Sequence, residues 1–310
     1  MTNLHSIKTI LLRAATQLKS QGIDAETAKL ETQLLLQHAL NVNRAWLIAH
    51  DHENLPPSIH EAYRAMLERR LNGEPIAYIL GYREFYGLNL KVTADTLIPR
   101  PDTETLVEAA LAKIPQSTTS SPPSFPRKRE SMLNLKQKMD SRFRGNDELR
   151  VLDLGTGTGA IALAVAKHRP HVLVTAVDTS ENALKIAQEN AQNLQIANVQ
   201  FTLSNWFDAL KYQRFDVIVS NPPYIEANDA HLNQGDLRFE PLLALASGVD
   251  GLDAIRHIIN SAPHYLKPHG WLALEHGYNQ AEAVANLLKK AGFSEIETRK
   301  DLGEIGRAHV

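Results

Sequence analysis

The 310-residue sequence contains no cysteine, which excludes disulfide bonds, thiolate metal ligands and cysteine nucleophiles. It also lacks an apolar run of about 18 residues and a basic, then apolar, leader at its start. Neither charge sign is in large excess, since 33 Lys and Arg face 35 Asp and Glu. This balance disfavours a surface that grips nucleic acid throughout, although it allows a local basic patch. We therefore expect a cytoplasmic protein with no membrane partner, no stable nucleic acid partner and no bound metal.

Three parts of the chain differ in pattern. Residues 1–73 carry apolar side chains at helical spacing, which predicts a small helical bundle, and Asp24 is a good N-cap for one of its helices. Residues 74–99 alternate apolar and polar positions, mix in aromatics and are interrupted by glycines, so they predict a β-hairpin linker. Residues 100–310 form the third and largest part.

The third part alternates buried strands with amphipathic helices. This order predicts an α/β domain with a doubly wound, mainly parallel sheet. The predicted strands are 151–154, 172–178, 199–203, 215–220 and 271–275, and the intervening helices are 161–168, 180–193, 254–266 and 279–291.

Residues 115–149 interrupt this domain with a polar, basic segment that is poor in aliphatic side chains. Such a composition cannot bury enough apolar area to offset the entropy of ordering the chain. We predict a disordered insertion, and favour a passive loop over a site for an anionic partner.

A glycine-rich loop follows the first predicted strand of the α/β part, and an aspartate, Asp178, ends the second. The loop consists of Gly155, Thr156, Gly157, Thr158 and Gly159. Glycines allow a sharp turn and close approach to a ligand, and an acid about twenty residues on suits the hydroxyls of a ribose. Dinucleotide and S-adenosylmethionine sites share these features, so a nicotinamide oxidoreductase stays open, as does a tight turn without a ligand.

A second motif follows the fourth predicted strand and consists of Asn221, Pro222, Pro223 and Tyr224. Ligands of open α/β sheets bind beyond the carboxyl ends of the strands, so this motif should face the same crevice as the glycine loop. The carbonyls of Asn221 and Pro222 offer two acceptors for one NH₂ group, and Tyr224 offers a flat face. The arrangement favours methyl transfer to a planar amide or amino nitrogen over a merely rigid turn.

The Asn-Pro-Pro-Tyr motif resembles that of amino-group methyltransferases, which include adenine-N6 nucleic acid enzymes and the HemK/PrmC glutamine-N5 protein methyltransferases. Two further stretches, 97–104 and 234–241, are similar to the HemK/PrmC family alone. The resemblance covers residues 5–113 and 149–303. It implies a Rossmann-like class I methyltransferase domain and S-adenosylmethionine as the cofactor.

The resemblance also implies roles for individual residues. The cofactor would lie over Gly155–Gly159, with its ribose on Asp178 and its adenine near Trp206, and Asn221 would also contact the cofactor. The substrate would be the glutamine of the Gly-Gly-Gln motif in class I peptide-chain release factors, docked partly by residues 1–73. Its amide would meet the motif residues Asn221, Pro222, Pro223 and Tyr224. Arg100 would bind substrate or brace the hinge. The alternative function is an adenine-N6 DNA or RNA methyltransferase.

Two positions depart from the family pattern. Asn205 stands where the family has an aspartate facing the adenine amino group, which predicts weaker cofactor binding. Residues 304–310 replace the family's final turn and strand, so we read them as a non-native ending and expect the sheet to lack its last strand.

Overall fold

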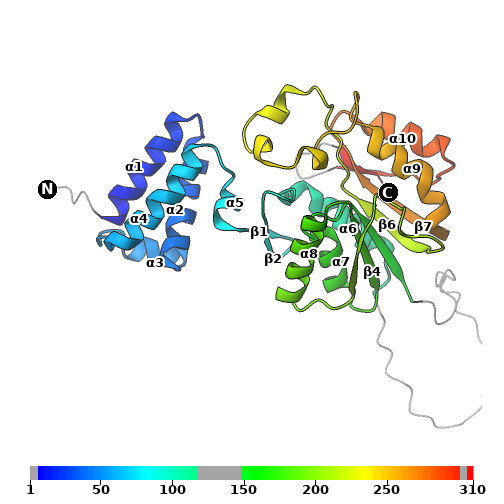
Figure 1. The fold of residues 1–310 in the computed structure, drawn as a ribbon, viewed down its shortest axis with the longest axis horizontal. Helices are drawn as coiled ribbons and strands as arrows, with labels where there is room; N and C mark the ends of the chain where they lie inside the picture. Colours follow the sequence, from blue (N-terminus) through cyan, green and yellow to red (C-terminus); the bar gives the residue numbers. More distant parts are fainter. Residues whose placement is uncertain (1–5, 117–147, 301–305, 310) are drawn as a thin grey trace, which may run out of the picture.

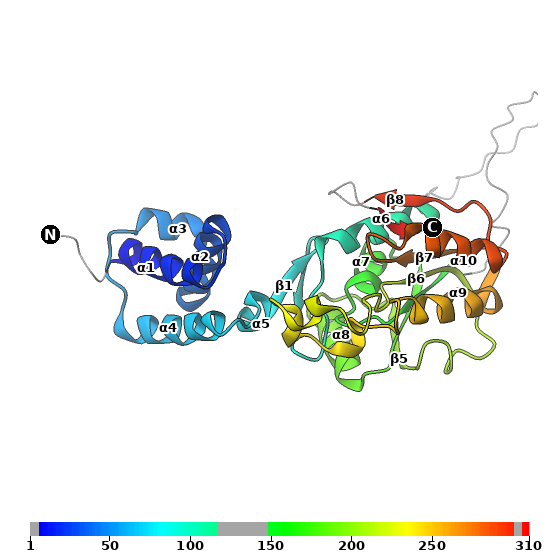
Figure 2. The same cartoon turned by 90° about the horizontal axis from the view of Figure 1, so that it is seen from above.

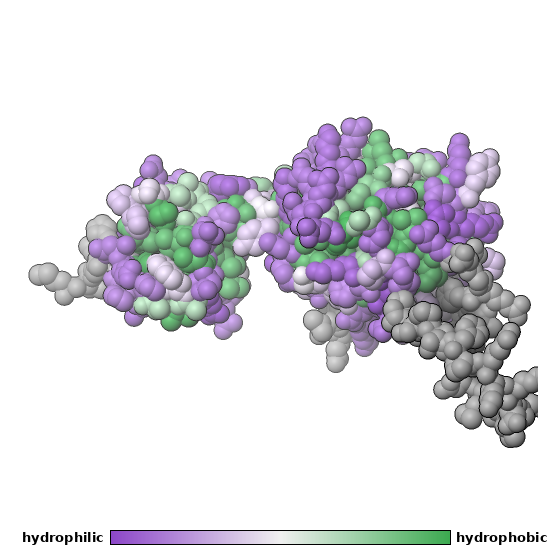
Figure 3. Space-filling model, turned by 90° about the horizontal axis from the view of Figure 1, so that it is seen from below, coloured by the Kyte–Doolittle hydropathy of each residue, from purple (hydrophilic) through white to green (hydrophobic). Residues whose placement is uncertain are grey.

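The computed structural model of the protein describes residues 6–116, 148–300 and 306–309. Most of the predicted insertion at 115–149 lies outside the described residues. Figures 1 and 2 show a helical N-terminal domain set apart from a larger domain of strands and helices, and Figure 3 shows the narrow connection between them. We call the larger domain the catalytic domain, after the role that the family resemblance implies for it. None of the helices in the described part of the chain combines the length and apolar character that a membrane span requires.

The N-terminal domain is a bundle, as the apolar spacing predicted. Its helices are α1 (Ile7–Ser20), α2 (Ala25–Leu40), α3 (Arg44–Ala49) and α4 (Pro57–Leu71). Their apolar stripes meet in one core that includes Leu18, Leu35 and Tyr63. Asp24 caps α2 as predicted, because its carboxylate accepts hydrogen bonds of 3.0 Å from the backbone N–H groups of Glu26 and Thr27.

The connection between the domains is shorter and more helical than the sequence indicated. A helix, α5 (Ile76–Leu80), occupies the start of the predicted hairpin, and Gly81 ends it in the left-handed conformation. The hairpin itself is β1 (Tyr82–Phe85) and β2 (Leu88–Lys91). Its buried side chains belong to the core of the catalytic domain, so the hairpin is part of that domain.

The catalytic domain is built on a seven-stranded sheet in the order β5-β4-β3-β6-β7-β9-β8. The strands are β3 (Arg150–Leu154), β4 (Leu173–Asp178), β5 (Val199–Leu203), β6 (Phe215–Ser220), β7 (Leu266–Glu275), β8 (Thr298–Lys300) and β9 (Gly306–His309). Strands β3 to β7 are parallel, as the alternation of strands and helices predicted. The central strands β3 and β6 are buried along almost their whole length because both faces of the sheet are covered there.

Helices cover the two faces of this sheet. The helices are α6 (Glu104–Lys113), α7 (Ala160–His168), α8 (Glu181–Asn193), α9 (Asp253–Tyr265) and α10 (Ala281–Lys290). One apolar core contains side chains of α6 and α7, and a second contains those of α9 and α10. Figure 1 shows the two groups of helices on opposite sides of the sheet.

The sheet has its last strand, so the expectation that it would be missing is wrong. Strand β9 pairs antiparallel with β7, with Glu275 opposite Ala308, and it also pairs with β8. Strand pairing uses backbone N–H and C=O groups, which every residue except proline supplies. An unusual sequence at 304–310 therefore does not prevent the backbone at 306–309 from completing the sheet.

The end of α4 contacts a short 3₁₀ helix of the catalytic domain, η3 (Leu237–Phe239). The Arg238 guanidinium donates a hydrogen bond of 3.0 Å to the carbonyl of Asn72. It lies so close to Gly73 that a Cβ there would meet Nη2 at 1.8 Å. Arg70 also pairs with Asp236 across the same contact, at 3.5 Å. A side chain at position 73 would therefore require the Arg238 guanidinium to move away from the Asn72 carbonyl.

We predict that Gly73→Ala destabilises the protein more than Gly22→Ala does. Both glycines have a φ of 89°, but a Cβ on Gly22 meets nothing within 4 Å, so both variants carry the same backbone strain. Only Gly73→Ala also displaces Arg238, which should add about 1 kcal/mol for the lost hydrogen bond. Urea unfolding of the two variants measures the difference, and equal losses would contradict a stabilising contact between α4 and η3.

Candidate active site

The two sequence motifs emerge side by side from the sheet. In the parallel pairing of β3 with β6, Leu154 lies opposite Ser220. The Ser220 hydroxyl donates a hydrogen bond of 2.8 Å to the Leu154 carbonyl. The next residues are Gly155 and Asn221, so both motifs begin at the same edge, as predicted from the carboxyl ends of the strands.

The first three backbone N–H groups of the glycine loop are hydrogen-bonded to the end of β4. The N–H groups of Gly155 and Thr156 both donate to the Val177 carbonyl at 2.9 Å, and that of Gly157 donates to the Asp178 carboxylate at 2.9 Å. In a dinucleotide site, such groups and the helix N-terminus receive the pyrophosphate. Because these three donors are already bonded within the protein, the loop is poorly prepared for a phosphate.

Asp178 lies at the end of β4 and turns both carboxylate oxygens to the loop region. One oxygen accepts from Gly157 and the other accepts from the Ser180 N–H at 2.9 Å. A carboxylate has about four acceptor positions, so each oxygen retains capacity for a hydroxyl. Burial raises the pKa of Asp178, and the backbone hydrogen bonds oppose that rise.

Not every residue of the loop faces the crevice. Thr156 is buried and its hydroxyl donates to Asp153 at 2.6 Å, and Thr158 is also buried. A Cβ on Gly159 would lie 3.1–3.2 Å from side-chain atoms of Leu163 and Ala187. The side chains of the two threonines thus point inward, and Gly159 serves the packing of α7 against α8.

Trp206 lies beside the loop, as the sequence interpretation required. A Cβ on Gly155 would be 3.8 Å from the Trp206 ring, and Trp206 is half-buried against the α9 and α10 core. Asn205 precedes it and is exposed. The loop, Asp178 and Trp206 therefore lie together at the carboxyl edge of the sheet.

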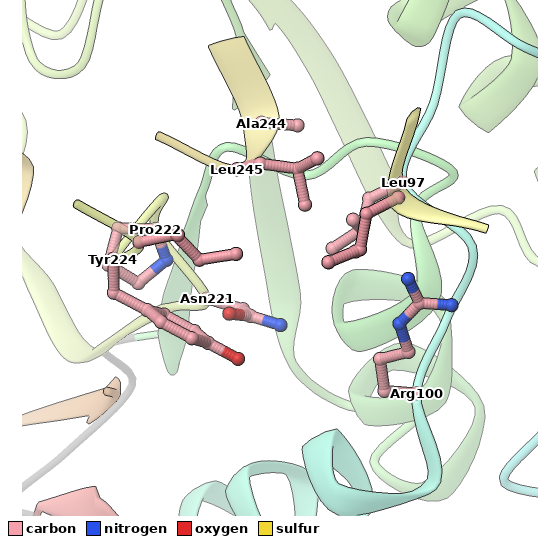
Figure 4. Close-up of a pocket in the computed structure, with 9 residues that line it drawn as sticks. Leu97, Arg100, Asn221, Pro222, Tyr224, Ala244 and Leu245 are labelled. Atoms are coloured by element: carbon pink, nitrogen blue, oxygen red, sulfur yellow. The ribbon is translucent and has the colours of Figure 1, made fainter. Parts of the chain in front are cut away.

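A small pocket opens beside Asn221. Its lining residues are Leu97, Arg100, Asn221, Pro222, Tyr224, Ile225, Leu237, Ala244 and Leu245. Figure 4 shows Asn221, Pro222 and Tyr224 on one side of it, with Leu97 and Arg100 on the other. The Asn221 side-chain nitrogen donates to the Thr103 hydroxyl at 3.1 Å. Four predicted substrate residues are thus brought together, and apolar residues from 237–245 complete the pocket.

Tyr224 is held at both ends by residues that the sequence did not single out for this purpose. Its hydroxyl bonds to the buried Glu275 carboxylate at 3.1 Å, and its carbonyl accepts from the Gln280 side chain at 3.0 Å. Gly251 allows this approach, since a Cβ there would lie 2.3 Å from the Tyr224 carbonyl oxygen. Glu275 and Gln280 therefore restrain Tyr224 at its hydroxyl and at its backbone carbonyl.

Arg100 pairs with Glu240, whose side chain is fully buried. Glu240 also accepts a hydrogen bond of 3.0 Å from the Ile98 N–H. Burial raises the pKa of Glu240, and the Arg100 guanidinium opposes that rise. The structure therefore shows Arg100 bracing the 97–103 segment against the 236–245 segment, while its guanidinium still lines the pocket.

Asp153 is a fully buried carboxyl beneath the glycine loop. One oxygen accepts from Thr156 and from the Ala162 N–H at 3.1 Å, and the other has no hydrogen-bond partner among the described residues. Burial raises the pKa of Asp153 to about 7. The folded state therefore favours the protonated form more than the unfolded state does. The contribution of this group to the free energy of unfolding is largest below about pH 4 and declines as the pH rises toward 7.

We predict that Asp153→Asn flattens this pH dependence. The amide keeps an acceptor for Thr156 and Ala162 but cannot ionise, so the loss of stability between pH 5 and pH 7.5 should shrink by about 1–3 kcal/mol. Urea unfolding at the two pH values measures it. Asp24→Asn is the control, because capping hydrogen bonds lower the pKa of Asp24 and it titrates below this range. An unchanged pH dependence in Asp153→Asn would contradict the assignment.

Two family models match the chain, in agreement with the two domains. Residues 9–81 match the PrmC N-terminal domain and residues 145–303 match a methyltransferase domain. Among solved structures, the catalytic domain of hMettl16 in complex with a hairpin of the MAT2A 3′UTR covers 79% of this chain and 80% of its own. At 13% identity and a TM-score of 0.51, that likeness shows the fold alone.

Curated relatives match over almost the whole chain. The chain is 45% identical to the release factor glutamine methyltransferase of Xylella fastidiosa strain Temecula1, over 97% of this chain and 96% of the relative. It is 42% identical to the protein of the same name from Escherichia coli K12, over 96% and 95%. The resemblance inferred from the motifs is confirmed: the chain belongs to the release factor glutamine methyltransferase family.

Proposed function

We propose that the protein transfers a methyl group from S-adenosylmethionine to the side-chain amide nitrogen of the glutamine in the Gly-Gly-Gln motif of class I peptide-chain release factors. One observation carries the proposal. Asn221 and its neighbouring carbonyl lie directly beside the glycine loop, in a chain whose relatives are named for this reaction over nearly their full length.

The crevice around the glycine loop fits S-adenosylmethionine, whose sulfonium supplies an electrophilic methyl group. We assign cofactor binding to Gly155, Thr156, Gly157, Thr158, Gly159, Asp178, Trp206 and Asn221. Asp178 retains acceptor capacity for two ribose hydroxyls, and Trp206 provides an aromatic face for adenine. The loop donors already bonded within the protein favour a cofactor without a pyrophosphate, so they speak against the nicotinamide alternative.

The acceptor would be held by Asn221, Pro222, Pro223 and Tyr224. An amide nitrogen is a poor nucleophile, because its lone pair is delocalised into the carbonyl. The Asn221 and Pro222 carbonyls would accept hydrogen bonds from its two N–H groups and fix its position. The Tyr224 ring would pack beside the planar amide and restrict its orientation. Such positioning supplies several kcal/mol, of order 7 at best. No activated nucleophile is required, and Arg100 would border the substrate while bracing the pocket.

The partner would be a protein. The near-neutral charge of the chain gives little support to a nucleic acid partner, and the curated relatives are named for release factors and not for nucleic acids. The N-terminal domain displays exposed apolar side chains, including Leu12 at 69% and Ile48 at 64% exposure. These support its proposed part in docking the release factor.

We expect the wild-type protein to methylate the glutamine of the Gly-Gly-Gln motif when it is incubated with release factor and S-adenosylmethionine. Asn221→Ala should lower the rate by about 100-fold or more, since it removes an acceptor that positions the amide. Asn193→Ala, an exposed change on α8, should leave the rate unchanged. Mass spectrometry of the release factor measures both. An unmodified glutamine with wild-type protein, or methyl transfer to DNA or RNA in its place, would overturn the proposal.

We also predict that Asn205→Asp tightens cofactor binding. The relevant contact is the one implied by the family, in which a carboxylate accepts from the adenine amino group, and a charged acceptor binds more strongly than an amide. The dissociation constant for S-adenosylmethionine should fall about three- to tenfold in calorimetric titration. Asn193→Asp makes the same chemical change away from the crevice and should have no effect. No gain in affinity for Asn205→Asp would refute the interpretation.

A further inference from the structure

We propose that Thr103 is a positioning residue for methyl transfer: its hydroxyl accepts from Nδ2 of Asn221 and holds the carboxamide in place beside the pocket, where Oδ1 is left for the acceptor. The inference rests on the proposed function and adds a residue from a different part of the chain. The problem that it solves is chemical. A carboxamide has an acceptor end and a donor end of nearly the same shape, and only the acceptor end can bind an NH₂ group.

The geometry places the donor end of Asn221 on Thr103. The Asn221 side-chain nitrogen donates to the Thr103 oxygen at 3.1 Å, and Thr103 is only 4% exposed. Figure 4 shows the side-chain oxygen of Asn221 on the Tyr224 side of the pocket and its nitrogen on the opposite side. In this orientation the acceptor N–H would bond to Oδ1 while Nδ2 bonds to Thr103. The Thr103 hydroxyl can accept or donate, so it fixes the position of the carboxamide, while the acceptor NH₂ group requires that Oδ1 be the end that faces it.

Thr103 is itself held firmly. It ends the 3₁₀ helix η1 (Pro101–Thr103), and its N–H donates to the Arg100 carbonyl at 3.1 Å. Arg100 is paired with the buried Glu240. The next element, α6, is anchored in the core by fully buried Leu106 and Val107. Because the chain is held on both sides of Thr103, its hydroxyl restrains the rotation of the Asn221 carboxamide. This restraint requires no reorganisation when the acceptor binds.

The test compares Thr103→Val, which keeps the shape but removes the hydroxyl, with Thr103→Ser, which keeps the hydroxyl. With release factor as substrate, kcat should fall roughly tenfold in Thr103→Val, with KM within about twofold because docking elsewhere is intact. Thr103→Ser should retain at least about half of kcat. Thr96→Val is the matched control: Thr96 is a buried threonine of the same segment, and its hydroxyl bonds to the Thr93 carbonyl. It should keep the wild-type kcat.

Two further measurements separate positioning from general structural support. In single-turnover experiments, Thr103→Val should lower the rate of Asn221→Ala by less than about twofold, because its effect passes through Asn221. In ¹⁵N spectra, Thr103→Val should shift the Asn221 side-chain amide signals, identified by their loss in Asn221→Ala, while Thr103→Ser should leave them in place. The spectra require no activity.

Several results would overturn the inference. These are wild-type kcat in Thr103→Val, an equal loss in Thr96→Val, no rescue by Thr103→Ser, or unmoved Asn221 amide signals in Thr103→Val. A wild-type protein that leaves the glutamine unmodified would refute the proposed function instead, while the spectra would still report on the contact between Thr103 and Asn221.

Discussion

The pairing of β3 with β6 is the constraint on which the site depends. It sets Leu154 opposite Ser220 and so brings the glycine loop and the Asn-Pro-Pro-Tyr motif to one edge of the sheet. The Ser220 hydroxyl adds a hydrogen bond to the Leu154 carbonyl across the same pair. A one-residue slip would turn each side chain of a strand to the opposite face. Such a slip would exchange side chains between the core beneath α6 and α7 and the core beneath α9 and α10, so the packing of the two cores determines the relative position of the two motifs.

Around this edge, the protein uses its polar groups mainly to hold one another. The Val177 carbonyl and Asp178 tie down the glycine loop, and Glu275 and Gln280 fix Tyr224. Groups preorganised in this way meet a reactant without rearranging, which is how a site without a strong nucleophile lowers a barrier. The backbone is left-handed here at Gly155 and Gly157, with φ values of 71° and 53° that glycine adopts readily, and at Trp206, with a φ of 49°.

Sequence patterns predicted the regular elements well, because the central strands β3, β4 and β6 are mostly apolar and buried on both faces. They failed where backbone or packing decided the outcome. Residues 76–80 form a helix in place of a strand, and residues 306–309 complete the sheet although their sequence departs from the family pattern. Gly159, which we propose contacts the cofactor, also lies where a Cβ would be 3.1–3.2 Å from Leu163 and Ala187. A glycine in a motif does not reveal by itself whether the absence of a side chain makes room for a ligand or for a neighbouring helix.

The sequence by itself determined the fold class, the two motifs and the family, because these depend on local order along the chain. Only the tertiary structure decided which partners hold the motif residues. Thr103 and Asn221 are 118 positions apart, Arg100 and Glu240 are 140 apart, and no periodicity links such pairs. Their contacts arise because α6 and the strands pack into one core, so the side chains beyond the ends of those elements meet.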